Sequence, residues 1–276
     1  MSISFNSFDH TYKSIDINES INWISITKLI SNFKKDFDSK QVAQKVSKNK
    51  KSKGFGYKPN EIEEIWNKES ERATSLGTYY HNQREYDLCS LASIERDGVN
   101  VPIFKPCNSN DIKIAPNQKL DPGIYPEHMV YLKSKGLCGQ SDLVEVVNGR
   151  VNIIDYKTNK EIKTESFKNW EGVSEKLKAP VNHLDDCNFN HYALQLSFYM
   201  YIILKHNPKL QLGKIYIHHV VFEEEGKDKH DYPITKFNHN NDPIVKKVIP
   251  IQMPYLYDEV ISIINYIQDN PNKIKK

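Results

Sequence analysis

The pair Asn148-Gly149 constrains the fold of this chain more than any other feature of the sequence. It separates two runs rich in valine and isoleucine, and an Asn-Gly pair in that setting is the strongest short-range signal for a hairpin with a two-residue type I′ turn. Such a turn fixes the register of the strands, so Val147 faces Arg150 and the pairs that follow stay in step. The sequence therefore predicts an antiparallel hairpin over residues 139–157.

One face of this hairpin changes from apolar to charged along its length. Near the turn the predicted pairs on this face are aliphatic, and at the far end they are Asp142 with Asp155 and Gln140 with Lys157. Two carboxylates placed opposite each other repel, and a divalent cation is the natural partner that offsets the repulsion, since hard cations bind carboxylate oxygens. A solvated sheet face with scattered charges is the alternative. We favour a metal site at this end of the hairpin.

The segments around the hairpin predict a mixed α/β domain with helices packed on a small sheet. Apolar side chains recur at helical spacing before and after the β-rich segments, and Gly77 interrupts one of these patterns, so we expect two helices there. The expected helices cover residues 26–37, 60–73, 78–91, 190–205 and 255–268, and the expected strands lie within 127–157 and 214–222. The stretches 97–124 and 158–189 are expected to be connections, and 227–250 is expected to form a hairpin or a loop.

Length, charge and cysteine spacing narrow the class of protein. The chain has 276 residues, enough for one large domain or two small ones, and its net charge of +3 favours no class of partner. Four widely spaced cysteines without a C-x-x-C pair argue against a zinc site or a disulfide framework. The start lacks the pattern of a signal peptide and no apolar run is long enough to cross a bilayer, so we expect a cytoplasmic protein without membrane contact.

Two helical segments carry polar pairs four residues apart, which places each pair on one helix face. His81 and Glu85 form the first pair, although a helical histidine is more often a surface or core residue than a ligand. Gln195 and Tyr199 form the second, within an otherwise apolar helix. A buried amide needs a hydrogen-bond partner, so Gln195 is the more informative of the four.

Four motifs in this order resemble the PD-(D/E)XK nuclease superfamily, in particular its RecB-like and phage-type exonuclease branch. The resemblance implies a restriction-endonuclease-like core: a helix, a three-stranded antiparallel start, a second helix and a further strand, in a mixed sheet flanked by helices. It also implies a lysine-rich helical extension over residues 1–59, a nuclease domain over 60–276, and a helical C-terminal addition. The motifs are Gly77-Thr78-Tyr79-Tyr80-His81 with Glu85, Gly139-Gln140-Ser141-Asp142, Ile153-Ile154-Asp155-Tyr156-Lys157, and Gln195-Leu196-Ser197-Phe198-Tyr199.

The resemblance also implies roles for individual residues. Those it identifies as metal ligands are His81, Asp142, Asp155 and the backbone carbonyl of Tyr156. Lys157 is expected to orient or activate the attacking water and to offset charge on the phosphate. Gln195 and Tyr199 are expected to position the DNA strand or this lysine. Supporting roles are implied for Glu85, Glu127 and Gln140.

The function implied is a divalent-metal-dependent DNA nuclease, expected to be an exonuclease of DNA recombination, repair or replication in a bacterial or phage-infected cell. Mg²⁺ or Mn²⁺ is expected, as one or two ions, and an imidazole ligand suits Mn²⁺ better. No cysteine follows Cys187, so we expect no iron–sulfur cluster, and no nucleotide cofactor. A separate annealing protein or helicase is a candidate partner. The alternatives are a structure- or site-specific endonuclease and a catalytically silent nucleic-acid-binding module.

The lysine-rich stretch 34–58 has two interpretations. Charge runs are usually solvated linkers or helix faces, whereas in a nuclease they also serve as contacts to the phosphate backbone. Both interpretations stay open. The candidate DNA contacts are Lys45, Lys48, Lys50, Lys51 and Lys53.

Overall fold

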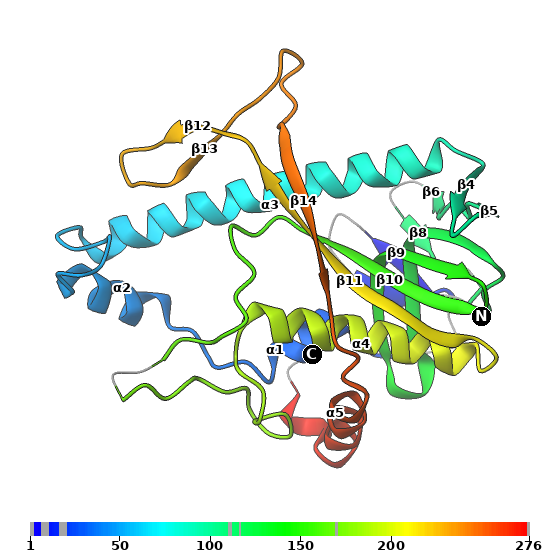
Figure 1. Cartoon of the computed structure of the whole chain (residues 1–276). Helices are drawn as coiled ribbons and strands as arrows, with labels where there is room; N and C mark the ends of the chain where they lie inside the picture. Colours follow the sequence, from blue (N-terminus) through cyan, green and yellow to red (C-terminus); the bar gives the residue numbers. More distant parts are fainter. Residues whose placement is uncertain are drawn as a thin grey trace.

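The largest sheet of the protein is built around the predicted hairpin. A computed structural model describes residues 3–6, 11–16, 21–109, 112–115, 117–168 and 171–274 (Figure 1). The sheet has six strands and is mixed, since β10 runs parallel to β11 while the hairpin and the β8–β9 and β11–β14 pairs are antiparallel. Its strands are β3 (Ile24–Ser25), β8 (Gly123–Leu132), β9 (Leu137–Val147), β10 (Arg150–Lys157), β11 (Gln211–Phe222) and β14 (Val245–Gln252).

The hairpin turn has the expected type I′ conformation. Asn148 and Gly149 both have positive φ, 51° and 72°, as this turn requires. The predicted register is confirmed from the Val147–Arg150 pair onwards, but the ladder ends at Leu143–Ile154. The sequence predicts that Asp142 faces Asp155 in the next pair. This prediction is wrong, because the ladder ends before these two residues.

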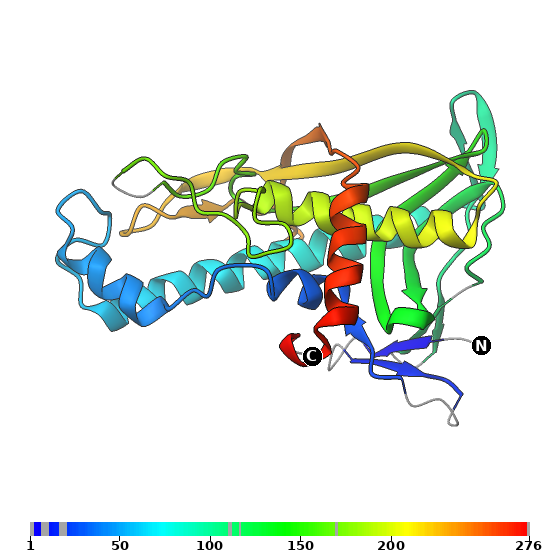
Figure 2. The ribbon, with the colours of Figure 1, turned by 90° about the horizontal axis from the view of Figure 1, so that it is seen from below.

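Helices cover both faces of the sheet, which confirms the expected restriction-endonuclease-like arrangement of a mixed sheet flanked by helices. The helix α4 (Asn188–His206) lies against one face together with α1 (Ile26–Ser31) and α5 (Tyr257–Asp269), and the main core forms between them (Figure 2). The long helix α3 (Pro59–Cys89) packs on the other face over smaller apolar clusters. Aliphatic residues of the hairpin therefore contribute to cores on both sides.

α3 is one helix of 31 residues, and the two helices expected on either side of Gly77 are a wrong prediction. Glycine costs about 1 kcal/mol in a helix relative to alanine, a weak signal that tertiary packing overrides here. A Cβ atom on Gly77 would lie 3.2 Å from the Thr158 Oγ1 atom. The glycine thus allows the chain leaving β10 to approach the helix closely, and the helix continues through it.

The N-terminal helical segment is shorter than predicted and is followed by a second helix. Ser25 is the N-cap of α1, because its hydroxyl accepts a hydrogen bond from the Lys28 N–H group at 3.2 Å. α2 (Ser39–Lys48) packs on the first half of α3, where Phe37 contacts Trp66. Both figures show α2 at the end of the molecule away from the β8–β9 strands. The division into residues 1–59 and 60–276 stays a prediction.

Several segments expected to be connections contain short strands. Within or beside 97–124 these are β4 (Ser93–Arg96), β5 (Val99–Pro102), β6 (Cys107–Ser109) and β7 (Ile112–Ile114), and a second sheet joins β6 and β7 to the N-terminal strands β1 (Ile3–Asn6) and β2 (Thr11–Ser14). The polar stretch before β14, predicted to be a hairpin or a loop, contains the hairpin of β12 (Glu224–Lys227) and β13 (Pro233–Thr235). Single turns of 3₁₀ helix occur at η1 (Lys133–Lys135) and η2 (Pro271–Lys273). In the described residues of 158–187, only isolated bridges occur. Among the helices that the structure describes, none is long and apolar enough to cross a membrane.

Candidate active site

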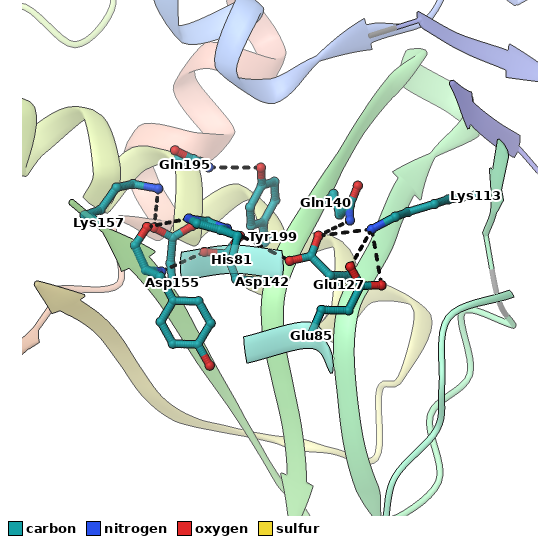
Figure 3. A network of polar contacts seen from close by, with 11 residues as sticks. His81, Glu85, Lys113, Glu127, Gln140, Asp142, Asp155, Lys157, Gln195 and Tyr199 are labelled. Atoms are coloured by element: carbon teal, nitrogen blue, oxygen red, sulfur yellow. Dashed lines mark hydrogen bonds and ion pairs between the residues drawn. The ribbon is translucent and has the colours of Figure 1, made fainter. Parts of the chain in front are cut away.

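The predicted site residues come together where β10 leaves the sheet beneath α3 (Figure 3). α3 supplies His81, β9 supplies Asp142, and β10 supplies Asp155 and Lys157. β8 adds Glu127 from the strand next to β9. The site therefore lies at one end of the hairpin, and the apolar pairs near the turn hold the two strands that carry it.

His81, Asp142 and the Tyr156 main chain are linked by three polar contacts. The His81 Nε2 atom lies 3.0 Å from the Tyr156 carbonyl oxygen, and its Nδ1 atom lies 3.3 Å from the Asp142 Oδ1 atom. The other oxygen of Asp142 accepts a hydrogen bond from the Tyr156 N–H group at 2.7 Å. One potential ligand atom each from His81, Glu127 and Asp142 lie within 4.8 Å of one another. A nitrogen and two carboxylates at this spacing suit a divalent cation.

Asp155 is a buried carboxylate with one charged partner. Its side chain is 1% exposed, and only Lys157 pairs with it among the described residues. The ammonium group of Lys157 forms an ion pair with one carboxylate oxygen and lies 5.0 Å above the ring of Tyr192. Burying a carboxylate in this way is costly. The other oxygen is free to bind a metal ion, although Asp155 is not one of the three residues, His81, Glu127 and Asp142, whose potential ligand atoms lie within 4.8 Å of one another.

Crowding of acidic groups shifts the proton affinities in the cluster. Burial and the Asp142 charge raise the pKa of Asp155 to about 6. Burial lowers the pKa of His81, but the charges of Asp142 and Glu127 outweigh it and raise that pKa to about 9. Burial opposes the charged form of Lys157 as well, yet Asp155 and Asp142 raise its pKa overall. The cluster therefore binds positive charge, as protons or as a cation.

Glu127 belongs to the group of three side chains that could hold a metal ion, whereas the resemblance implied only a supporting role for it. It is opposite Asp142, between the paired residues Pro126–Leu143 and His128–Ser141, and its φ of 49° is in the left-handed region that non-glycine residues rarely adopt. Gln140 donates a hydrogen bond to its carboxylate. Burial and the Asp142 charge raise the pKa of Glu127 to about 8.

Lys113 is a participant that the sequence reasoning missed. Its ammonium group lies 3.2 Å from a carboxylate oxygen of Glu85 and 3.5 Å from one of Glu127. Glu85 therefore faces Lys113, although it shares a helix face with His81. A single lysine in a loop-rich segment carries no signal in the sequence, because its position depends on β7 pairing with β1 and β6.

Two of the motifs contact each other directly. The Gln195 side-chain amide donates a hydrogen bond to the Tyr199 hydroxyl at 3.1 Å, and Tyr199 is buried. A Cβ atom on Gly139 would lie 2.5 Å from the Tyr199 Cε1 atom, too close for any side chain. The glycine of β9 thus makes room for the tyrosine of α4, which brings Gln195 to the side of the cluster where Lys157 lies (Figure 3).

The structure does not bring the predicted DNA-contacting lysines to this cluster. Lys45, Lys48, Lys50, Lys51 and Lys53 are exposed, on α2 and the loop after it. Lys53 forms an ion pair with Asp231 of the β12–β13 hairpin. The rise along α3 from Pro59, beside this loop, to His81 is about 33 Å at 1.5 Å per residue. Any DNA contact by these lysines is therefore remote from the cluster.

Comparison with known proteins gives one match. The family model of the PD-(D/E)XK nuclease superfamily matches residues 41–252, more than half of the chain. No match was found among curated proteins or among solved structures. The matched range spans α3, the hairpin, α4 and β11, and so includes every residue of the cluster. Nucleases of this superfamily use divalent metal ions, for which the cluster offers a suitable set of side chains. The chain belongs to the PD-(D/E)XK nuclease superfamily.

Proposed function

We propose that this protein is a divalent-metal-dependent deoxyribonuclease that removes nucleotides from DNA ends, and that it belongs to the RecB-like and phage-type branch. The observation that carries the proposal is the buried carboxylate of Asp155: Lys157 pairs with one oxygen, the other has no partner among the described residues, and the negative charge of Asp142 is close by. A structural ion pair alone leaves the second oxygen of Asp155 unexplained. A role as metal ligand accounts for that oxygen.

The residues that would hold Mg²⁺ or Mn²⁺ are His81, Asp142, Asp155 and the carbonyl of Tyr156, with Glu127 as a further carboxylate. Such a cation lowers the pKa of a bound water and neutralises phosphate oxygens. One or two ions fit the number of carboxylates, and the His81 nitrogen favours Mn²⁺ on ligand preference.

Lys157 acts as a cation in this proposal. Its charged form is stabilised by Asp155 and Asp142, so it offsets the negative charge that develops on the phosphate in the transition state and orients the attacking water. The amide of Gln195, held by Tyr199, positions the DNA strand beside it. The lysines of α2 and its following loop contact the DNA backbone farther along the duplex or strand, as point charges.

The branch suggests a role in DNA recombination, repair or replication in the cytoplasm of a bacterial or phage-infected cell. The sequence contains no helicase motif of its own, so strand separation or annealing would come from a separate protein. A site- or structure-specific endonuclease and a catalytically silent DNA-binding module are the competing functions.

The test is digestion of DNA by the wild-type chain and by Asp155→Asn and Lys157→Ala variants. Linear single- and double-stranded substrates labelled at either end are compared with a closed circle, with Mg²⁺, with Mn²⁺ and with chelator. We expect early release of the end label, resistance of the closed circle, and loss of cleavage in both variants. Asp97→Asn, an exposed turn residue with a φ of 50° that asparagine also adopts, is the matched control and is expected to retain activity.

Each competing function has its own outcome. Cutting of the closed circle would identify an endonuclease. Binding of DNA without cleavage under any metal condition would identify a silent module. Full activity of Asp155→Asn would show that the catalytic site lies elsewhere.

A further inference from the structure

A cavity adjoins the cluster through Glu127, which lines it, whereas His81 does not. It has a volume of about 370 Å³ and lies between β8, β7 and the segment joining β5 to β6. This volume is at the lower end of the range for small-molecule sites, roughly 300–1,000 Å³. The cavity therefore suits a single small group such as one nucleotide, and is too small for a length of duplex.

The charged side chains of this cavity are mostly basic. Lys105, Lys113 and Lys119 line it together with the amide of Asn117. Lys113 is already held between two glutamates, whereas Lys105 and Lys119 are exposed and form no ion pair with any residue that the structure describes. Asp121 is an acidic residue at the rim, and Glu127 shares its carboxylate with Lys113 and Gln140. Two unpaired ammonium groups beside a small cavity favour an anion.

An aromatic wall accompanies these lysines. The rings of Phe104 and Tyr125 stack with centroids 4.7 Å apart and an interplanar angle of 12°. Gly123 leaves room for Phe104, since a Cβ atom there would lie 2.7 Å from the Phe104 Cδ2 atom. Phe104 is nevertheless 40% exposed. The contact with Tyr125 holds the ring in place, and part of the ring surface is exposed to solvent. Aromatic side chains of this kind stack on nucleic acid bases.

We infer that this cavity binds one phosphorylated nucleotide of the substrate strand, with the phosphate on Lys105 and Lys119 and the base on Phe104. The inference rests on the proposed nuclease function for its substrate. Glu127 and Lys113 belong to both the cavity and the catalytic cluster, so a nucleotide held there lies next to the bond that is cleaved. The cavity thereby fixes how far the strand advances into the site.

Binding is measured separately from cleavage to test this inference. The Asp155→Asn chain, with chelator present, is titrated with deoxyadenosine 5′- and 3′-monophosphates and with deoxyadenosine. We expect one or both monophosphates to bind at least about tenfold more tightly than the nucleoside, the difference that charge-assisted hydrogen bonds supply. Lys105→Ala/Lys119→Ala should remove that difference, and Phe104→Ala should weaken both nucleotide and nucleoside.

Lys209→Ala/Lys214→Ala is the matched control. It removes the same charge from two exposed lysines outside the cavity, around the start of β11, and is expected to bind nucleotide like the parent. In the active chain, Lys105→Ala/Lys119→Ala should raise KM for end-labelled DNA while kcat changes little. Equal binding by the Lys105→Ala/Lys119→Ala chain and its parent, or no binding at millimolar monophosphate, would overturn the inference. Neither result depends on whether the chain cleaves DNA, so a failure of this inference is distinguishable from a failure of the proposed function.

Discussion

Single glycines and buried polar side chains determine the geometry of this site. Gly139 is important because it has no side chain: the ring of Tyr199 occupies the space that a Cβ atom would need. Asp155 is important because one of its buried oxygens has no partner among the described residues. The turn predicted that Asp142 and Asp155 follow the apolar pairs of the hairpin, but not that the ladder ends before them. Lys113 was not predictable, because its place depends on a sheet assembled from distant segments.

Gly139→Ala is expected to lower the free energy of unfolding by about 1–3 kcal/mol, the usual cost of adding a methyl group to a packed core. The added atom would displace the ring of Tyr199 and with it the hydrogen bond to Gln195, so cleavage should fall as well. Urea unfolding and a cleavage assay measure the two effects. Gly226→Ala, with open space around the added atom, is the control, and equal stability of the two variants would contradict this account.

His128 gives the folded chain an acid-sensitive group outside the proposed ligand set. It is 3% exposed, and burial lowers its pKa to about 4, whereas the unfolded value is about 6.5. The unfolded chain therefore binds the proton first, and stability is lost as the pH falls from about 6.5 to about 4. Between pH 7 and pH 5 this amounts to about 2 kcal/mol.

His128→Phe should remove this part of the pH dependence, as measured by urea unfolding at the two pH values. The exposed residue His239 supplies the control His239→Phe, which should leave the dependence as it is in the wild type. An unchanged pH dependence in His128→Phe would refute the assignment.

At the scale of elements, features set by neighbouring residues were predicted well, and features set by contacts between distant segments were not. The register of the β9–β10 hairpin followed from its turn, because two residues with positive φ allow only one pairing. Gly77 was misinterpreted as a helix end, because the reason for that glycine lies in β10 and the residue after it. The second sheet, β2-β1-β7-β6, was missed for the same reason. Its strands are short, and about ninety residues separate β2 from β6 in the sequence.

The contact between Gly77 and Thr158 leads to a prediction about α3. Alanine is favoured over glycine in a helix by about 1 kcal/mol, but at this position its Cβ would lie 3.2 Å from the Thr158 Oγ1 atom. Gly77→Ala should therefore gain little or lose stability in the wild type, and should stabilise the Thr158→Ala chain. Thermal or urea unfolding of the four chains gives the coupling, expected to be at least about 0.5 kcal/mol. Additive effects would show that the two residues do not constrain each other.

At the scale of the whole molecule, the candidate catalytic cluster joins elements that are far apart in the sequence. α3, β8, β9 and β10 each supply at least one of its side chains. The resemblance of the four motifs predicted this convergence, and the family match supports membership over residues 41–252. Composition and charge could not have located it, because the cluster is a small part of a chain with an almost balanced charge.

Metal binding should therefore stabilise the entire fold. A ligand that binds only the folded state adds about 2.7 kcal/mol at one hundred times its Kd, so millimolar Mn²⁺ or Mg²⁺ should raise the Tm of the wild-type chain. Asp155→Asn should lose most of this increase and Asp97→Asn should keep it. A Tm that does not respond to either ion, measured by calorimetry, would argue against a metal centre in this cluster.

The continuity of α3 has a consequence for its length. The helix that receives α2 near its start also carries His81 near its end, without a break, so the angular phase between these two points is set by the number of residues between them. One inserted residue would rotate His81 by about 100° away from the Tyr156 carbonyl, and only insertions close to a whole number of turns would restore it. Between Ile62 and Leu76, the count of residues is therefore more constrained than the identity of those on the exposed face.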